Sequence, residues 1–186
     1  MWKSTSWLNP DVDVLIDILA LPRRPRAEWG LPKEKGVYAL FLNPESFLDT
    51  RPSESGLLYL GKAENRNGLQ GRCHFEGRTV NHSPRKSLAS LLSSELSLKA
   101  YWYRDARGRL KWGLQPGSDS RLFSWMHSNL LLALHPCENA KSIEQSLIDK
   151  LEPPLNIDKS LRHLNNEQRR VKEIREGFRA TATERV

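Results

Sequence analysis

The chain has 186 residues, which is long enough for one domain with its own hydrophobic core and short terminal additions. It contains 29 Lys and Arg against 22 Asp and Glu, which gives a formal net charge of +7. This balance favours association with a polyanion over association with an acidic protein surface or an acidic metabolite. We therefore expect nucleic acid as the partner class.

Cysteine content and hydropathy bear on the compartment. Cys73 and Cys137 provide no disulfide framework, and no CxxC spacing indicates structural zinc. The first residues include no apolar run of signal-peptide length, and no stretch approaches the roughly 18 apolar residues of a membrane span. We expect a soluble cytoplasmic protein that does not enter a membrane.

The first 34 residues predict a helix followed by a basic connector. Asn9 can cap a helix over about 10–20, with Pro10 at its first position. Prolines then break a segment that contains several arginines, which predicts an extended connector over the surface.

Apolar runs, helical spacing and turn residues predict the elements that follow. The strands are expected at 36–42, 57–62 and 129–134, with an elaborated loop at 43–56 between the first two. The helices are expected at 66–77, 84–97, 119–128 and 140–151. The residues from Tyr101 to Trp112 predict a small hairpin inside an expected insertion at 99–118, and residues 165–178 predict a charged terminal helix.

Five short motifs, far apart in the chain, resemble the GIY-YIG nuclease superfamily. They are Gly36-Val37-Tyr38, Tyr59-Leu60-Gly61, Leu69-Gln70-Gly71-Arg72, Ile143-Glu144 and Pro153-Pro154-Leu155-Asn156. Each motif alone is weak, whereas chance rarely supplies all of them in this order. The resemblance covers about 35–158, which we predict to be the nuclease domain, with 1–34 before it and a basic helical tail at 159–186 after it.

The resemblance implies an α+β fold, with a small three-stranded antiparallel sheet flanked by helices and an active site on one concave sheet face. The N-terminal helix, the inserted hairpin and the C-terminal helix would be additions to this fold. The long loop at 43–56 and the insertion at 99–118 depart from the family pattern, and both could reshape the substrate groove.

The resemblance also implies a metal-dependent endonuclease that hydrolyses DNA phosphodiester bonds. Tyr38 would be the general base on water, and Tyr59 would orient the attacking water. A phenol has a pKa of about 10, so a base near neutral pH needs a shift of roughly three units. Lys62 and Arg72 are the cations expected to supply that shift.

The remaining site residues concern metal, phosphate and positioning. Glu144 would be the sole protein carboxylate on a divalent ion, Mg²⁺ or Mn²⁺, completed by waters and phosphate oxygens. Arg72, a planar fork suited to phosphate, would hold the scissile group. Asn156 is expected to fix Glu144 or the local backbone. His74 and His82 compete for a site histidine, and we favour His82 because a helix start follows it.

One pattern is rejected. The residues from Gly56 to Lys62 match the spacing of a phosphate-binding loop, but their middle is an apolar strand, and Ala63 lacks the hydroxyl that binds Mg²⁺. We expect no nucleotide cofactor.

Two basic segments are candidates for DNA contact. The first contains Arg66, Arg72, Arg78, Arg85 and Lys86. The second is the tail, which is either a phosphate-tracking surface or a solvated helix packed by Val171 and Ile174. A non-cleaving nucleic-acid-binding module on the same fold is the alternative function, and a structural protein that binds RNA or a membrane is a third. Repair, restriction and mobile-element roles, like the oligomeric state, stay open at this point.

Overall fold

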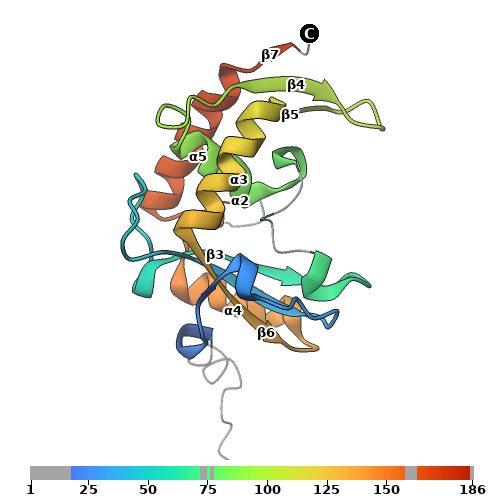
Figure 1. The fold of residues 1–186 in the computed structure, drawn as a ribbon, viewed down its shortest axis with the longest axis vertical. Helices are drawn as coiled ribbons and strands as arrows, with labels where there is room; N and C mark the ends of the chain where they lie inside the picture. Colours follow the sequence, from blue (N-terminus) through green and yellow to red (C-terminus); the bar gives the residue numbers. More distant parts are fainter. Residues whose placement is uncertain (1–17, 72–74, 76–77, 158–162, 185–186) are drawn as a thin grey trace, which may run out of the picture.

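The structure is a computed structural model, and it describes residues 18–71, 75, 78–157 and 163–184. A central antiparallel sheet lies between helix α4 on one side and helices α2, α3 and α5 on the other (Figure 1). A small second sheet lies beyond these three helices, at the end of the molecule where the C-terminus is marked.

The central sheet contains the three strands predicted from the sequence. They are β2 (Gly36–Leu42), β3 (Leu57–Ala63) and β6 (Leu130–Pro136), and β2 pairs antiparallel with both of the others. A two-residue strand, β1 (Arg24–Pro25), pairs with β6 and gives the order β1-β6-β2-β3. The basic connector thus extends the expected sheet by one short edge strand. A 3-10 turn, η1 (Arg26–Glu28), follows β1.

Alternating side chains divide the core into two layers. Val37, Ala39 and Phe41 point to one face of β2, where they cluster with residues of α4 (Ala140–Leu151). Tyr38 and Leu40 point to the other face. There they join the larger core formed with α2 (Ser83–Leu91), α3 (Pro116–Asn129) and α5 (Asn166–Ala180).

Two of the predicted helices are shorter than expected. The helix expected at 84–97 ends at Leu91 and continues as turns, and Ser97 adopts a left-handed φ of 49°. For residues 66–71 the helix expected at 66–77 is wrong, because only a 3-10 turn, η3 (Gly68–Gly71), forms there. Gly68 has a φ of 50°, and a Cβ on it would lie 2.2 Å from the carbonyl oxygens of Lys33 and Glu34. An α-helix cannot run through such a residue.

Short 3-10 turns and the helix near the N-terminus complete the description of the domain. The turns are η2 (Glu54–Gly56), which precedes β3, and η4 (Thr79–Asn81), which precedes α2. Of the helix expected over 10–20, residues 18–20 are helical and the remainder lies outside the described residues.

The predicted hairpin forms and anchors the second sheet. Its strands are β4 (Ala100–Arg104) and β5 (Leu110–Leu114), and Trp102 and Trp112 face each other across it. A short strand near the C-terminus, β7 (Thr183–Glu184), pairs parallel with β4.

The terminal helix α5 packs into the domain. Asn165 and Gln168 form a capping box at its start, and Val171 and Phe178 are buried in the core shared with α2 and α3. Glu167 accepts a hydrogen bond from Thr50 Oγ1 at 2.6 Å, so the start of α5 also holds the long loop after β2.

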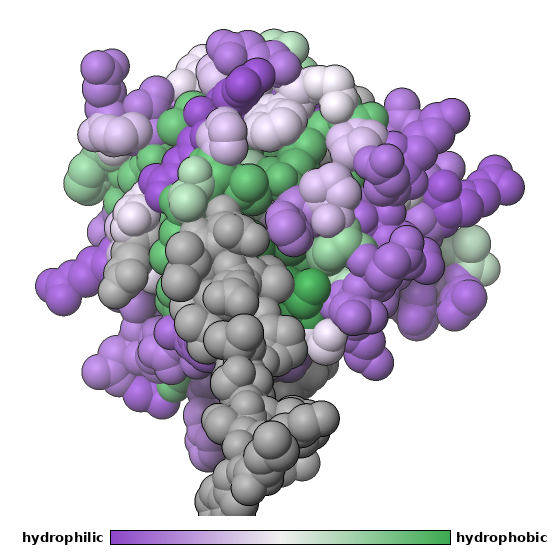
Figure 2. All heavy atoms as spheres, turned by 90° about the horizontal axis from the view of Figure 1, so that it is seen from below, coloured by the Kyte–Doolittle hydropathy of each residue, from purple (hydrophilic) through white to green (hydrophobic). Residues whose placement is uncertain are grey.

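The surface of the lower end of the molecule carries both kinds of side chain. Figure 2 shows hydrophilic side chains around the margin of this face and hydrophobic ones toward its middle. Within the described ranges, every helix is too short or too polar to traverse a lipid bilayer.

Candidate active site

The two motif tyrosines lie on the same face of the β2–β3 ladder. Tyr38 of β2 pairs with Gly61 of β3, and Leu40 pairs with Tyr59, so both phenol rings point toward the larger core. Their ring centroids are 6.1 Å apart, with 41° between the ring planes. Tyr38 is only 2% exposed, whereas Tyr59 is half-buried. Tyr59 is therefore the more accessible of the two tyrosines.

Gly61 makes room for the Tyr38 side chain. A Cβ at this position would lie 2.3 Å from both Cζ and Oη of Tyr38, well inside van der Waals contact. The phenol thus lies directly over the backbone of β3. The second motif has a glycine at this position because any side chain there would collide with the Tyr38 ring.

We expect Gly61→Ala to displace the Tyr38 ring. Because the ring is buried, overpacking should lower the free energy of unfolding by about 1–3 kcal/mol, as urea denaturation would measure. Gly177→Ala is the matched control, since an added Cβ meets nothing within 4 Å in the middle of the last helical turns. That variant should be neutral or slightly stabilising. Equal stability of the two variants would contradict the steric role of Gly61.

The other motif pair is an ion pair between β3 and α4. Lys62 Nζ donates a hydrogen bond to Glu144 Oε2. The Lys62 side chain is 31% exposed and that of Glu144 is 14% exposed, so solvent reaches both groups. A pair of this kind adds about 0–1 kcal/mol to stability. It is better suited to contacting a ligand than to holding the fold together.

The register places the two pairs on opposite faces of the sheet. Lys62 pairs with Val37 and therefore points toward α4, while its neighbour Gly61 lies under the Tyr38 ring. The expectation of a site on one sheet face thus needs revision. Tyr38 and Lys62 lie near the same end of the ladder, two residues and one residue from its last pair, Gly36 and Ala63, whereas Tyr59 lies four residues from that end. A substrate phosphate would reach both only around this end.

A pocket of about 500 Å³ opens beside Lys62, at the N-terminal end of α4. It combines cations, carboxylates and amides, which are the groups expected around a phosphate and a metal ion. Its lining consists of Lys62, Glu64, Glu138, Asn139, Lys141, Ser142 and Gln145. The sequence analysis missed all of these except Lys62, and the one available signal was the helix start at Asn139. Arg66 is exposed in the turn after β3, near the same end of the strand.

Asn156 acts on the backbone rather than on Glu144. Its Nδ2 donates to the carbonyl of Leu60 at 2.8 Å, and its Oδ1 accepts from the Leu60 amide at 2.9 Å. The amide of Leu155 also donates to the carbonyl of Leu58 at 3.0 Å. Because β3 is an edge strand, this segment satisfies backbone groups that would otherwise lack a neighbour. Of the two roles expected for Asn156, the structure supports the backbone one.

The basic residues before and within α2 have different environments and therefore different roles. Arg85 is fully buried and forms an ion pair with Asp119, with 3.2 Å between the charged atoms, so its assignment to DNA contact is wrong. Lys86 is half-buried over the Trp112 ring. Arg78 is exposed. Arg72 and His74 lie outside the described residues. His82 immediately precedes α2.

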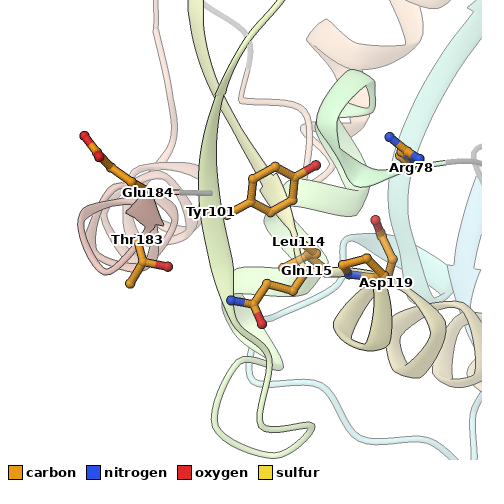
Figure 3. Close-up of a pocket in the computed structure, with 8 residues that line it drawn as sticks. Arg78, Tyr101, Leu114, Gln115, Asp119, Thr183 and Glu184 are labelled. Atoms are coloured by element: carbon orange, nitrogen blue, oxygen red, sulfur yellow. The ribbon is translucent and has the colours of Figure 1, made fainter. Parts of the chain in front are cut away.

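A second pocket, of about 620 Å³, lies between the hairpin, β7 and the start of α3 (Figure 3). Arg78, Tyr101 and Asp119 are among its lining residues. Among the motif residues that the structure describes, none lines it. We therefore base the candidate site on the end of the β2–β3 ladder and not on this pocket.

The donor set at Glu144 fits a sparse metal site. In the described part of the chain, no three His, Cys, Asp or Glu side chains group closely enough to hold a metal ion. Mg²⁺ binds proteins through one or two carboxylates and keeps several waters and substrate phosphates as its other ligands. A single carboxylate beside an open pocket agrees with that mode.

Comparison of the sequence with known protein families agrees with the resemblance on which the candidate site is based. The model of the GIY-YIG catalytic domain matches residues 36–177. The chain belongs to this family. Searches of the curated proteins and of the solved structures found no match. The matched stretch of the GIY-YIG domain includes the hairpin and most of α5, so both lie inside the region that the family model describes.

Membership in the GIY-YIG family has consequences at a coarse level. The family is generally one of endonucleases, so a nuclease-type function and a nucleic-acid substrate follow from it. GIY-YIG nucleases typically use divalent metal ions. The mixed α+β architecture with its antiparallel sheet agrees with the family fold.

Proposed function

We propose that this protein is a metal-dependent endonuclease that hydrolyses phosphodiester bonds of DNA. The observation that carries the proposal is the partly exposed Lys62–Glu144 pair, which lies at the ladder end where the Tyr38 ring covers Gly61. These are the residue types that hydrolysis of a phosphodiester needs: a base, a cation and a metal-binding carboxylate.

Tyr38 is the proposed general base on water. Burial opposes a phenolate, so nearby positive charge has to stabilise it. Arg72, which lies outside the described residues, is the proposed source, because Lys62 points to the other face of the sheet and is paired with Glu144. Tyr59 is the proposed orienting group, because its more accessible ring lies against Tyr38.

Glu144 is the proposed ligand of the divalent ion, Mg²⁺ or Mn²⁺. Such an ion, when bound, neutralises charge that develops on the phosphoryl oxygens. Lys62 holds the Glu144 carboxylate in the apo protein and can transfer its hydrogen bond to a phosphate oxygen when substrate arrives. The chain itself therefore supplies the proton acceptor, one fixed cation and the carboxylate.

Tyrosine-to-phenylalanine variants test the assignment of the base. We expect Tyr38→Phe to reduce the initial rate of plasmid cleavage in Mg²⁺ by about 100- to 10,000-fold, because positioned proton transfer contributes that much to catalysis. Tyr59→Phe should cost about tenfold or less, as it removes one orienting hydrogen bond. EDTA should stop cleavage by the unmodified protein.

The ranking of the two variants decides the outcome. A larger loss for Tyr59→Phe would transfer the role of base to the more accessible tyrosine. If the unmodified protein binds plasmid DNA but does not nick it in either Mg²⁺ or Mn²⁺, the protein is the non-cleaving nucleic-acid-binding module.

A further inference from the structure

Four cations from three elements lie near one another beside the hairpin. They are Lys86 of α2, Lys111 of β5, and Arg175 and Arg179 of α5, and we refer to them as the cation cluster. None of them belongs to the motifs of the candidate active site. Figure 1 shows the hairpin and the end of α5 at one end of the molecule, with α4 near the other end.

Aromatic rings and one hydroxyl hold the cluster in place. Lys86 Nζ lies 4.9 Å from the centroid of the Trp112 ring, and Arg179 Cζ lies 5.1 Å from that of Trp102. The two tryptophans are direct cross-strand partners. Arg175 Nη1 donates to Ser83 Oγ, at the start of α2, at 3.0 Å. Lys86, Arg175 and Arg179 are therefore each held by a contact with another element.

The charge of the cluster is poorly compensated. Among the described residues, neither Lys86 nor Arg179 forms an ion pair, and Lys111 is paired with Asp105 at 3.2 Å. Burial and, to a smaller extent, the neighbouring charges of Arg175, Lys111 and Arg179 together lower the pKa of Lys86 to about 8. Like charges held this close repel each other, and an anion would relieve that repulsion.

We propose that the cation cluster binds the phosphate backbone of duplex DNA, away from the site of cleavage. The identity of the partner rests on the function proposed above, whereas the anion preference rests on the cluster alone. Backbone phosphates fit this surface because they repeat at regular spacing, and several cations on different elements can each contact one. Arg179 is exposed and the others are half-buried, so the surface is open to a ligand.

Salt dependence of binding tests the cluster. Affinity for a short duplex is measured in EDTA, so that cleavage does not interfere, with the full chain and a series of salt concentrations. We expect Arg179→Gln and Lys86→Met each to reduce the slope of log K against log salt by about 1, because each removes one phosphate contact. Methionine keeps an unbranched stem against Trp112. Lys150→Gln, an equal loss of charge on the exposed part of α4, should leave the slope unchanged.

The pH dependence of binding gives a second readout. The charged groups around Lys86 are Arg175 and Arg179 on α5 and Lys111 on β5, and a bound phosphate adds the opposite charge. Phosphate should raise the pKa of Lys86 above about 8, so affinity is full below that pH and falls as the pH rises through it, because binding then requires proton uptake. Lys86→Arg should retain the affinity up to about pH 9.5, since arginine stays charged.

The outcomes separate the two proposals. Equal salt slopes for the two cluster variants, the control and the unmodified protein would overturn the DNA-binding role, even if cleavage is normal. If the protein does not cleave DNA but the salt slopes change as expected, the endonuclease function is overturned and the DNA-binding role of the cluster stands. Tighter binding of an RNA duplex of the same length would reject DNA as the partner.

Discussion

Glu144→Gln should reduce cleavage on the order of 1,000-fold, about 4 kcal/mol in transition-state stabilisation, because it removes the one motif carboxylate available to a divalent ion. The substitution keeps the shape of the side chain. The lost ion pair with Lys62 is partly exposed, so the free energy of unfolding should fall by about 1 kcal/mol or less. Initial rates on supercoiled plasmid in Mg²⁺, together with urea denaturation, measure the two effects.

Asp149→Asn is the matched control for Glu144→Gln. Asp149 lies on the same helix, is exposed, and accepts a hydrogen bond from Gln145 at 2.8 Å. The Asp149→Asn variant loses the same charge as Glu144→Gln but keeps the proposed metal ligand, so it should cleave plasmid at the normal rate. Undiminished cleavage by Glu144→Gln, or an equal loss in both variants, would remove Glu144 from the proposed site. Duplex binding in EDTA should be similar for all three proteins.

Arg85→Met should lower the free energy of unfolding by about 3–5 kcal/mol, the usual cost of removing one partner of a buried ion pair. Arg85 donates to Asp119 at 3.2 Å and to the carbonyl of Phe75 at 3.0 Å. Asp119 also accepts from the backbone amide and hydroxyl of Thr79. Burial lowers the pKa of Arg85, and the Asp119 charge opposes that shift. The guanidinium thus connects α2, α3 and the turn before α2.

Arg78→Met is the matched control, because Arg78 is exposed and lies seven positions before Arg85. It should change the free energy of unfolding by about 0.5 kcal/mol or less. The double variant Arg85→Met with Asp119→Leu should be more stable than Asp119→Leu alone, since the latter leaves a buried charge without its carboxylate. A stable Arg85→Met protein with reduced DNA affinity would restore the original assignment of Arg85 to DNA contact.

Local patterns predicted the elements that depend on local chemistry. The strands at 36–42, 57–62 and 129–134 are apolar and rich in strand formers, and each forms within about two residues of the expected bounds. The hairpin is confirmed, as is the terminal helix, which begins with a capping box at Asn165. Strand alternation also fixes which face each motif side chain occupies once the register is known.

Local patterns failed where the outcome depended on distant groups. Gly68 is left-handed because the carbonyls of Lys33 and Glu34 approach it, and neither contact is visible in the helical spacing around it. Basic composition suggested that Arg85 contacts DNA, but composition does not distinguish a surface cation from one that α3 buries.

Taken alone, the sequence determined the family, the strands and the identity of the motif residues, because these depend on residue type and short-range order. Only the tertiary structure decided that Asn156 binds the backbone of Leu60, 96 positions away, and that the tyrosine pair and the Lys62–Glu144 pair lie on opposite faces of the β2–β3 ladder. It also decided that cations from α2, β5 and α5 share one surface. The physical reason is that hydrogen bonds and Coulomb interactions act over a few ångströms of space, and the path of the chain sets which residues come within that range.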